Sequence, residues 1–202
     1  MTKTRINTNW SYRGLKAIIL ENELLRLDIF PEAGAKIYNL VYKPLDRNLL
    51  WHNPRIPLRK APFGARFDDW WSGGWDELFP NDAPCIHQGE FYADHGEMWT
   101  QTWNWQVVKD DAQEVCVYLR CYTPITPALF EKWISLKAEE AQIHLRYRIT
   151  NVGYGPFDFL WDLHPAVNID PHTRIDIPAT TMHIDKAYRE RFHPDHPTYR
   201  WP

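Results

Sequence analysis

Two histidines lie in segments rich in acidic and aromatic residues, and one of them, His164, could take part in proton transfer. His95 belongs to residues 94–99 (DHGEMW), and His164 follows the apolar stretch 159–163 (FLWDL). Imidazole titrates near neutral pH, so a histidine held rigidly at the end of a strand can donate a proton to an ether oxygen. The alternative for His164 is a buried ring hydrogen-bonded to Asp162 or to the backbone, which is the usual state of a buried histidine.

Four carboxylates near these segments could accept hydrogen bonds from ligand hydroxyl groups. Asp76, Glu77 and Asp82 lie in residues 73–82 (GGWDELFPND), and Glu97 lies two residues after His95. The glycine pair at 73–74 would let a ligand approach the backbone closely. Each carboxylate could equally be a solvated loop residue, which is the commoner case for exposed acids.

A dedicated metal site is not expected. The chain has nine histidines, and Asp94 and Glu97 bracket His95, but there is no HExxH sequence, no paired CxxC and no HxH with a downstream glutamate. His193 and His196 lie in a proline-rich tail and are expected to be solvated. We therefore predict neither a metal nor another cofactor.

Aromatic residues make up 15% of the chain and include 11 tryptophans. An indole offers a flat apolar face with a polar edge, which suits the C–H face of a pyranose ring. A sugar is therefore a reasonable ligand class, and Trp99, beside His95, is a candidate contact. The alternative, which we expect for most of the tryptophans, is that they fill a β-sheet core.

The net charge and the cysteine content indicate which classes of partner and which cell compartment to expect. The net charge of -3 and the pI of about 6.3 provide no basic surface for nucleic acid and no polybasic membrane patch. The three cysteines form no CxxC, and the first thirty residues lack a secretory leader pattern. These features predict a reduced, cytoplasmic protein, and 202 residues are consistent with a single domain over 1–202.

Alternation of apolar and polar residues recurs along the chain and predicts strands. It is clearest at 25–29 (LRLDI), 115–122 (VCVYLRCY) and 143–150 (IHLRYRIT), with further strands expected at 37–42, around 99–107 and at 130–136. Short turns are expected at 138–141 and 151–156. Strands with one apolar and one polar face predict an all-β fold, an antiparallel two-sheet β-sandwich. Residues 53–95, with five prolines and clustered tryptophans, are expected to form a long functional loop.

These segments, taken in order, resemble the galactose mutarotase-like (aldose 1-epimerase) superfamily over nearly the whole chain. Residues 24–42 are similar to its first hairpin, including the corner Pro31-Glu32-Ala33-Gly34. The glycine pair at 73–74, Pro80 and His95-Gly96 follow the superfamily's central pattern. Residues 130–151 resemble the paired strands that precede its catalytic histidine, and His164-Pro165-x-x-Asn168-Ile169 matches its histidine signature.

The resemblance implies a supersandwich fold and chemistry at sugar C1. An acid protonates the ring oxygen while a base removes the anomeric hydroxyl proton, and the opened sugar closes to the other anomer. By this match His164 is the acid, His95 binds the sugar, and Arg66 is a candidate sugar-clamping arginine. Asp76, Glu77, Asp82, Glu97, Trp99 and Asp162 are further candidates for substrate binding.

The chain departs from the superfamily in ways that shape the expected function. The resemblance covers its N-terminal two-thirds, and its base, a glutamate on later strands, and a later aspartate would lie beyond Pro202. Whether Glu97, Glu77 or Asp162 replaces that base is left open. Ser72 and Met98-Trp99 stand where the sugar-phosphate epimerases carry arginines, so an unphosphorylated sugar is expected.

We therefore expect an aldose 1-epimerase-type isomerase. Two alternatives are a non-catalytic carbohydrate-binding protein, which needs no base, and an interaction protein that uses the tryptophan-rich loop as a contact patch. A sandwich incomplete at its C-terminus would expose sheet edges, and exposed edges pair. This predicts a homodimer or a truncated product of marginal stability.

Overall fold

The computed structural model describes residues 3–184 and 198–201. The chain divides into two compact units, Met1–Asn168 and Ile169–Pro202. The first carries both main sheets and all the predicted site residues. The second contains the strand pair β14 (Thr181–His183) and β15 (Thr198–Arg200), which is antiparallel. The predicted solvated histidines His193 and His196 lie outside the described residues.

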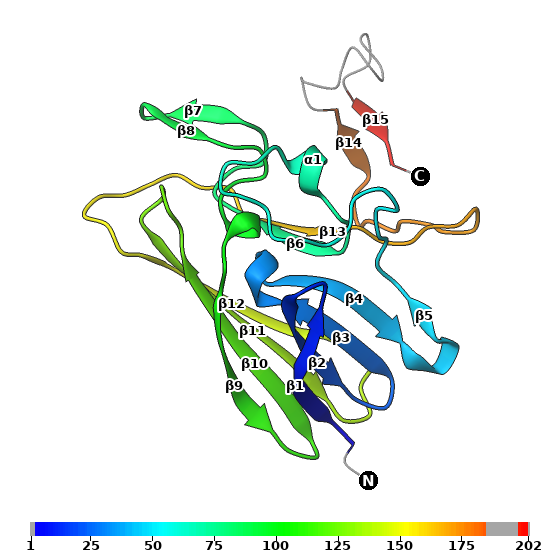
Figure 1. The fold of residues 1–202 in the computed structure, drawn as a ribbon. Helices are drawn as coiled ribbons and strands as arrows, with labels where there is room; N and C mark the ends of the chain where they lie inside the picture. Colours follow the sequence, from blue (N-terminus) through cyan, green and yellow to red (C-terminus); the bar gives the residue numbers. More distant parts are fainter. Residues whose placement is uncertain (1–2, 185–197, 202) are drawn as a thin grey trace. The chain divides into compact units, whose positions relative to one another are not determined.

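A seven-stranded antiparallel sheet forms one layer of the first unit (Figure 1). Its strand order is β1-β2-β3-β4-β6-β13, with β5 paired to β4. The strands are β1 (Arg5–Tyr12), β2 (Leu15–Glu21), β3 (Leu25–Phe30), β4 (Lys36–Tyr42), β5 (Arg47–Asn48), β6 (Trp75–Leu78) and β13 (Asp162–Pro165). Strands distant in sequence therefore meet where β4 pairs with β6 and β6 with β13.

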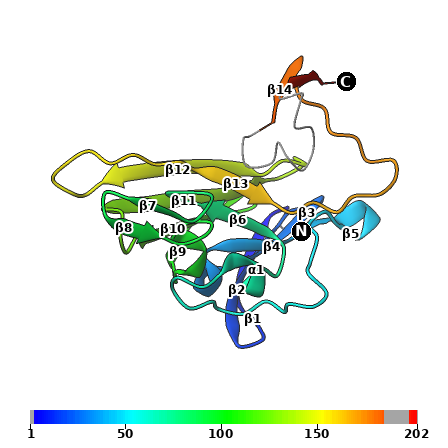
Figure 2. The ribbon, with the colours of Figure 1, turned by 90° about the horizontal axis from the view of Figure 1, so that it is seen from above.

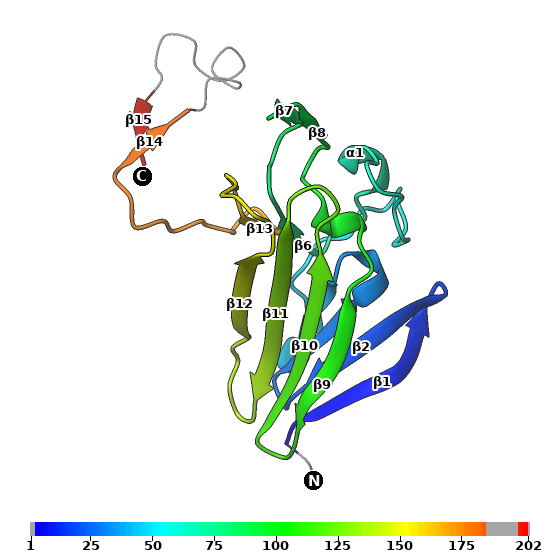
Figure 3. The same ribbon diagram turned by 90° about the vertical axis from the view of Figure 1, so that its left-hand side faces the viewer.

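A four-stranded antiparallel sheet forms the other layer, and Figure 3 shows it strand by strand in the order β12-β11-β10-β9. Its members are β9 (Asn104–Asp110), β10 (Glu114–Tyr122), β11 (Ala128–Lys137) and β12 (His144–Asn151). The predicted antiparallel two-sheet β-sandwich is confirmed. The predicted turns at 138–141 and 151–156 lie at the ends of β11 and β12.

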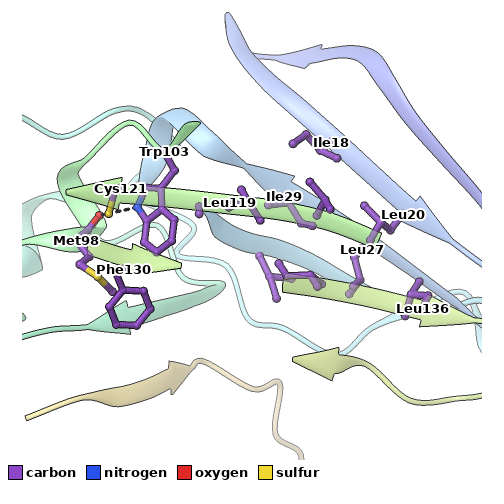
Figure 4. Packing of buried hydrophobic residues seen from close by; sticks show 14 of the residues in the cluster. Ile18, Leu20, Leu27, Ile29, Met98, Trp103, Leu119, Cys121, Phe130 and Leu136 are labelled. Atoms are coloured by element: carbon purple, nitrogen blue, oxygen red, sulfur yellow. Dashed lines mark hydrogen bonds between the residues drawn. The ribbon is translucent and has the colours of Figure 1, made fainter. Parts of the chain in front are cut away.

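The core lies between the two layers, because the alternation of apolar and polar residues places the apolar side chains of each strand on its inner face. In β10, Val115, Val117 and Leu119 are fully buried, while the residues between them are half-buried or exposed. β2 and β3 contribute matching residues from the other sheet. Figure 4 shows Trp103, Met98, Cys121 and Phe130 gathered at one end of this core, where the Trp103 Nε1 donates to the Met98 carbonyl over 3.3 Å.

Residues 53–95 are more structured than the expected loop. They contain α1 (Phe67–Trp70), β6 and the antiparallel hairpin β7 (Cys85–His87)–β8 (Glu90–Tyr92). β6 escapes a pattern-based prediction because it is four residues long and carries a charged but buried residue on each face, Asp76 on one and Glu77 on the other, so the sequence shows no apolar face.

Three short 3₁₀ helices complete the unit. They are η1 (Pro31–Ala33), η2 (Lys43–Leu45) and η3 (Met98–Thr100). The aromatic strand predicted from Trp99 onward begins only at residue 104, because Trp99 lies in η3. Trp99 and Trp103 are both buried although neither lies in a strand: Trp103 packs in the core, and Trp99 packs with Phe67. No helix in the described part of the chain is long and apolar enough to cross a membrane.

Candidate functional site

His164 is placed beside Asp76 by the pairing of β13 with β6. The two residues are directly opposite each other in the antiparallel register, and cross-strand partners project from the same face of a sheet. Figure 2 shows the two strands side by side. The neighbouring residue Glu77 contacts side chains of the second sheet, so Asp76 and His164 lie on the face turned away from the core.

His95 reaches the same place from the loop after β8. Its backbone N–H donates to the Asp82 carbonyl over 2.7 Å, and its ring lies parallel to that of Phe67, with centroids 3.7 Å apart. The imidazoles of His95 and His164 meet edge to face, with centroids 5.3 Å apart and an interplanar angle of 80°. The structure therefore brings together the two histidines singled out in the sequence.

Gly96 allows this approach. A Cβ at Gly96 would lie 2.2 Å from the Phe79 carbonyl oxygen, and its φ of +74° disfavours other residues. The Glu97 N–H donates to that same carbonyl over 2.7 Å, which ties the His-Gly segment to the end of β6. The glycine is needed for the position of His95.

Aromatic rings enclose the histidine pair. Phe67 and Trp71, the ends of one turn at α1, lie 5.7 and 5.5 Å from the His164 ring centroid. Trp99 packs edge-on against Phe67 at 5.1 Å, and its Nε1 donates to the Asp94 carbonyl over 3.3 Å. Phe67 and Trp71 were not among the predicted site residues, although their i,i+4 spacing beside the glycine pair is a signal that could have indicated them.

Lys36 is a third residue that the sequence-based analysis missed. Its Nζ donates to Asp76 Oδ2 over 2.6 Å and to the Gly73 carbonyl over 2.8 Å, and both side chains are nearly inaccessible. Asp76 Oδ1 accepts no hydrogen bond within the described part of the chain. Asp76 is therefore held by Lys36 with one carboxylate oxygen still unpaired beside His164.

Burial lowers the pKa of His164 below that of a free imidazole. The positive charges of Lys36 and of a protonated His95 act in the same direction, while the carboxylates of Asp76 and Asp82 oppose it. His164 is therefore mainly neutral at pH 7, and its Nδ1 has no hydrogen-bond partner among the described residues. A neutral imidazole can both donate and accept a hydrogen bond.

Glu77 lies on the core side of the sheet, away from the histidines. Its Oε1 accepts from Lys132 Nζ over 2.6 Å and from the Tyr147 hydroxyl over 2.8 Å, and Trp161 Nε1 lies 3.4 Å from Oε2. Burial, followed by the negative charge of Glu77, raises the pKa of Tyr147. Strand alternation thus separates Glu77 from its neighbour Asp76.

The carboxylate of Glu97 is also hydrogen-bonded within the protein. Its carboxylate accepts hydrogen bonds from the Ile125 N–H over 2.5 Å, the Thr126 N–H over 3.0 Å and the Thr126 hydroxyl over 2.8 Å. Glu97 is 1% exposed. It anchors the loop between β10 and β11, and the structure does not bring its carboxylate to the histidine pair.

The other predicted binding residues are more exposed. Arg66 precedes α1, and its Nη1 lies 3.9 Å from the Asp69 carboxylate, with 80% of its side chain exposed. Asp82 is exposed but close enough to influence His164. Asp162 is exposed on β13, two residues before His164 and on the same face by alternation. No group of three or more potential metal ligands is found in residues 3–184 and 198–201.

Comparison with known proteins identifies the fold. No protein-family model matches the chain, and no curated protein matches it significantly. Among solved structures, a galactose mutarotase-like protein from Lactobacillus casei is 18% identical with a TM-score of 0.53, over 76% of this chain and 50% of that one. A galactose mutarotase related enzyme from Lactobacillus acidophilus is also 18% identical, with a TM-score of 0.52, over 79% of this chain and 51% of that one.

The chain has the galactose mutarotase-like fold. The resemblance inferred from the sequence motifs is thereby confirmed at the level of the fold. An identity of 18% shows the shared fold alone and not a shared activity. The chain spans about half the length of the two matched structures. In this mutarotase-like unit, the His95–His164 pair lies on the outer face of the seven-stranded sheet.

Proposed function

We propose that the mutarotase-like unit binds an unphosphorylated aldose at the His95–His164 pair and interconverts its anomers by acid–base ring opening. The observation that supports this best is the edge-to-face meeting of the two imidazoles at 5.3 Å beside Phe67 and Trp71. Aromatic walls suit the C–H face of a pyranose, and two imidazoles supply hydrogen bonds and a proton.

In this proposal His164 is the general acid. Its protonated form transfers a proton to the ring oxygen as the bond between C1 and that oxygen breaks. A base takes the proton of the C1 hydroxyl, and the electrons of that O–H bond form the second bond of the C1 carbonyl. Rotation about C1–C2 and the reverse steps give the other anomer, with no net change in protons. The lowered pKa of His164 makes its protonated form scarcer at pH 7 but a stronger acid.

Charge near the histidines favours a neutral sugar. Lys36 is neutralised by Asp76 and also donates a hydrogen bond to the Gly73 carbonyl, so its Nζ is not offered to a ligand. Arg66 is directed to solvent beside Asp69. A bound phosphate would need at least one such cation for charge-assisted hydrogen bonds.

A specific observation also supports non-catalytic carbohydrate binding as a second candidate. Glu77 and Glu97, two of the three proposed substitutes for the base, each accept hydrogen bonds from buried protein groups. The third, Asp162, is exposed, and the free Oδ1 of Asp76 is closed off from solvent. Sugar binding needs none of these groups to move a proton.

Anomer exchange measured by NMR tests the two candidates. Freshly dissolved α-D-glucose and α-D-galactose are followed with the protein, with His164→Ala and with Tyr154→Ala, a control at an exposed position. Acceleration that His164→Ala removes and Tyr154→Ala keeps would support the isomerase. Sugar binding without acceleration would support the binding protein. If neither sugar binds nor exchanges faster, both candidates are wrong.

A further inference from the structure

A pocket lies on the outer face of the seven-stranded sheet, over β1 to β4. It has a volume of about 320 Å³, at the lower end of the range typical of small-molecule sites. Its wall includes Trp10, Tyr12, Phe30 and Tyr38, with Asp28 and Asn39 between them. It shares none of these residues with the His95–His164 site.

Two β-bulges create the aromatic wall. On β1, Ile6 pairs with the core residue Leu20, so continued alternation would also turn Trp10 inward. A register shift between Asn7 and Trp10 reverses this, and Trp10 pairs instead with Ala17 of the outer face. Trp10 and, two residues on, Tyr12 therefore project outward, where they are 60% and 45% exposed.

The second bulge lies between β3 and β4. Asp28 pairs with Asn39 and Ile29 with Ile37, which leaves Tyr38 as the extra residue. Tyr38 and Asn39 both line the pocket as a result. Bulges that redirect side chains in this way are common beside functional sites.

The rings form one continuous surface. Tyr12, Phe30 and Tyr38 have mutual centroid distances of 5.9 to 6.3 Å, and Tyr38 stacks on His52 at 3.8 Å with an interplanar angle of 1°. His52 Nε2 lies 2.8 Å from the Tyr38 carbonyl and must donate its hydrogen, so Nδ1 is left as an acceptor when the ring is neutral. Trp10 adds an exposed indole face at the rim.

A row of hydrogen-bonding groups crosses this aromatic surface. Asn39 Nδ2 donates to Asp28 Oδ2 over 2.5 Å, and Asn48 Nδ2 donates to Asn39 Oδ1 over 2.9 Å. Arg26 Nε lies 3.2 Å from Asp28 Oδ1 but not in hydrogen-bonding geometry, and this oxygen is buried, so the exposed part of the Asp28 side chain is what a ligand can reach. Asp28 is thus oriented by Asn39 while 13% of its side chain stays exposed.

We propose that this pocket binds a neutral saccharide through one pyranose unit. Flat rings with amide and carboxylate groups between them match a ligand that has both C–H faces and hydroxyl groups. None of the lining residues is Lys or Arg, which disfavours an anion. A quaternary ammonium ion would also suit aromatic rings, but Arg26 beside Asp28 and Arg13, 5.7 Å from the Tyr12 centroid, offset the negative charge that it needs.

Methyl glycosides, whose blocked C1 hydroxyl prevents anomer exchange, test binding at this pocket independently of anomer exchange at the histidine site. Methyl α-D-glucopyranoside, methyl β-D-galactopyranoside, maltose and choline chloride are titrated into ¹⁵N-labelled protein, and the Trp10 indole signal is followed together with the Asn39 side-chain amide signal, which remains in Trp10→Ala. We expect a saccharide to shift both signals in the wild type and in His164→Ala alike. Trp10→Ala should weaken that binding about tenfold, Asp28→Asn should weaken it independently, and Tyr154→Ala should leave it unchanged.

Several results would overturn the proposal. Choline binding that depends on Trp10, in place of saccharide binding, would identify a cation site. Saccharide binding that His164→Ala abolishes, and that Trp10→Ala and Asp28→Asn leave intact, would assign all binding to the histidine pair. A Trp10 signal that no saccharide probe moves would also contradict it. Because the probes other than maltose have a blocked C1 hydroxyl or no sugar ring, failure of anomer exchange leaves this test unaffected.

Discussion

Replacing Lys132 by methionine should destabilise the protein severely, because it leaves the Glu77 carboxylate buried in the sandwich without its positively charged partner. Lys132 is 0% exposed and Glu77 is 1% exposed, and their Nζ–Oε1 distance is 2.6 Å. Methionine fills a similar volume but leaves the carboxylate with only the Tyr147 hydroxyl and the distant Trp161 Nε1 as donors. Removing one partner of a buried ion pair costs about 3 to 5 kcal/mol.

This cost corresponds to a melting temperature about 6 to 20 °C lower, since a protein of this size loses roughly 2 to 4 °C per kcal/mol. Urea unfolding monitored by tryptophan fluorescence would measure it, with the slope m checked for constancy. The double variant Lys132→Met/Glu77→Gln should regain most of the loss, because the amide carries no charge and still accepts from Tyr147. Lys109→Met, at an exposed pair with Glu114, serves as the surface control and should change stability little.

Three results would refute this reasoning. If Lys132→Met unfolds at the same urea concentration as the wild type, the ion pair does not stabilise the fold. If Glu77→Gln removes anomer exchange without changing stability, Glu77 acts in catalysis and its assignment to the core is wrong. An additive double variant, with no recovery, would show that the two side chains are not energetically coupled.

Three further predictions concern the histidine site and its support. Glu97→Gln should lower the free energy of unfolding by about 1 to 3 kcal/mol, because it weakens the hydrogen bonds that anchor the loop between β10 and β11; urea unfolding would measure this loss. Asp76→Asn should lower the pKa of His164 further, because Asp76 raises it in the wild type; ring NMR titration would show this, and an upward shift would contradict it. Gly96→Ala should lower the melting temperature and displace His95, whereas Gly155→Ala, with open space around its Cβ, should do neither.

The pH dependence of stability follows from the same histidine. Burial depresses the pKa of His164 in the folded state, so at pH values below about 6.5 the unfolded chain binds this proton more readily. The stabilising contribution is complete above the unfolded pKa and is lost as the pH falls through the folded pKa. His164→Gln should therefore flatten the stability profile in this window, as thermal unfolding across pH would show.

The strands could be predicted where one sheet face is buried and the other is not. β10 alternates throughout and β3 alternates over residues 25–29, so their existence and their inward residues follow from local sequence. β6 could not be found in this way, because it is only four residues long and both of its faces are buried although each carries a charged residue, Asp76 on one and Glu77 on the other. Trp99 misled the prediction of β9, because an aromatic residue packed by a loop looks like a strand residue.

The sequence by itself determined that the chain is a two-sheet β-sandwich and that His95 and His164 are its candidate proton-transfer groups. Alternation and residue type are local properties and are sufficient for the sandwich, whereas the choice of the two histidines together rests on the resemblance of their motifs to those of the superfamily. Only the tertiary structure decided which carboxylates accompany the histidines. Asp76 and Glu77 are equivalent as neighbours in sequence, but the pleat of β6 points them to opposite faces. Lys36 and the outward turn of Trp10 depend on cross-strand pairing and on a bulge, which are set by contacts between distant segments.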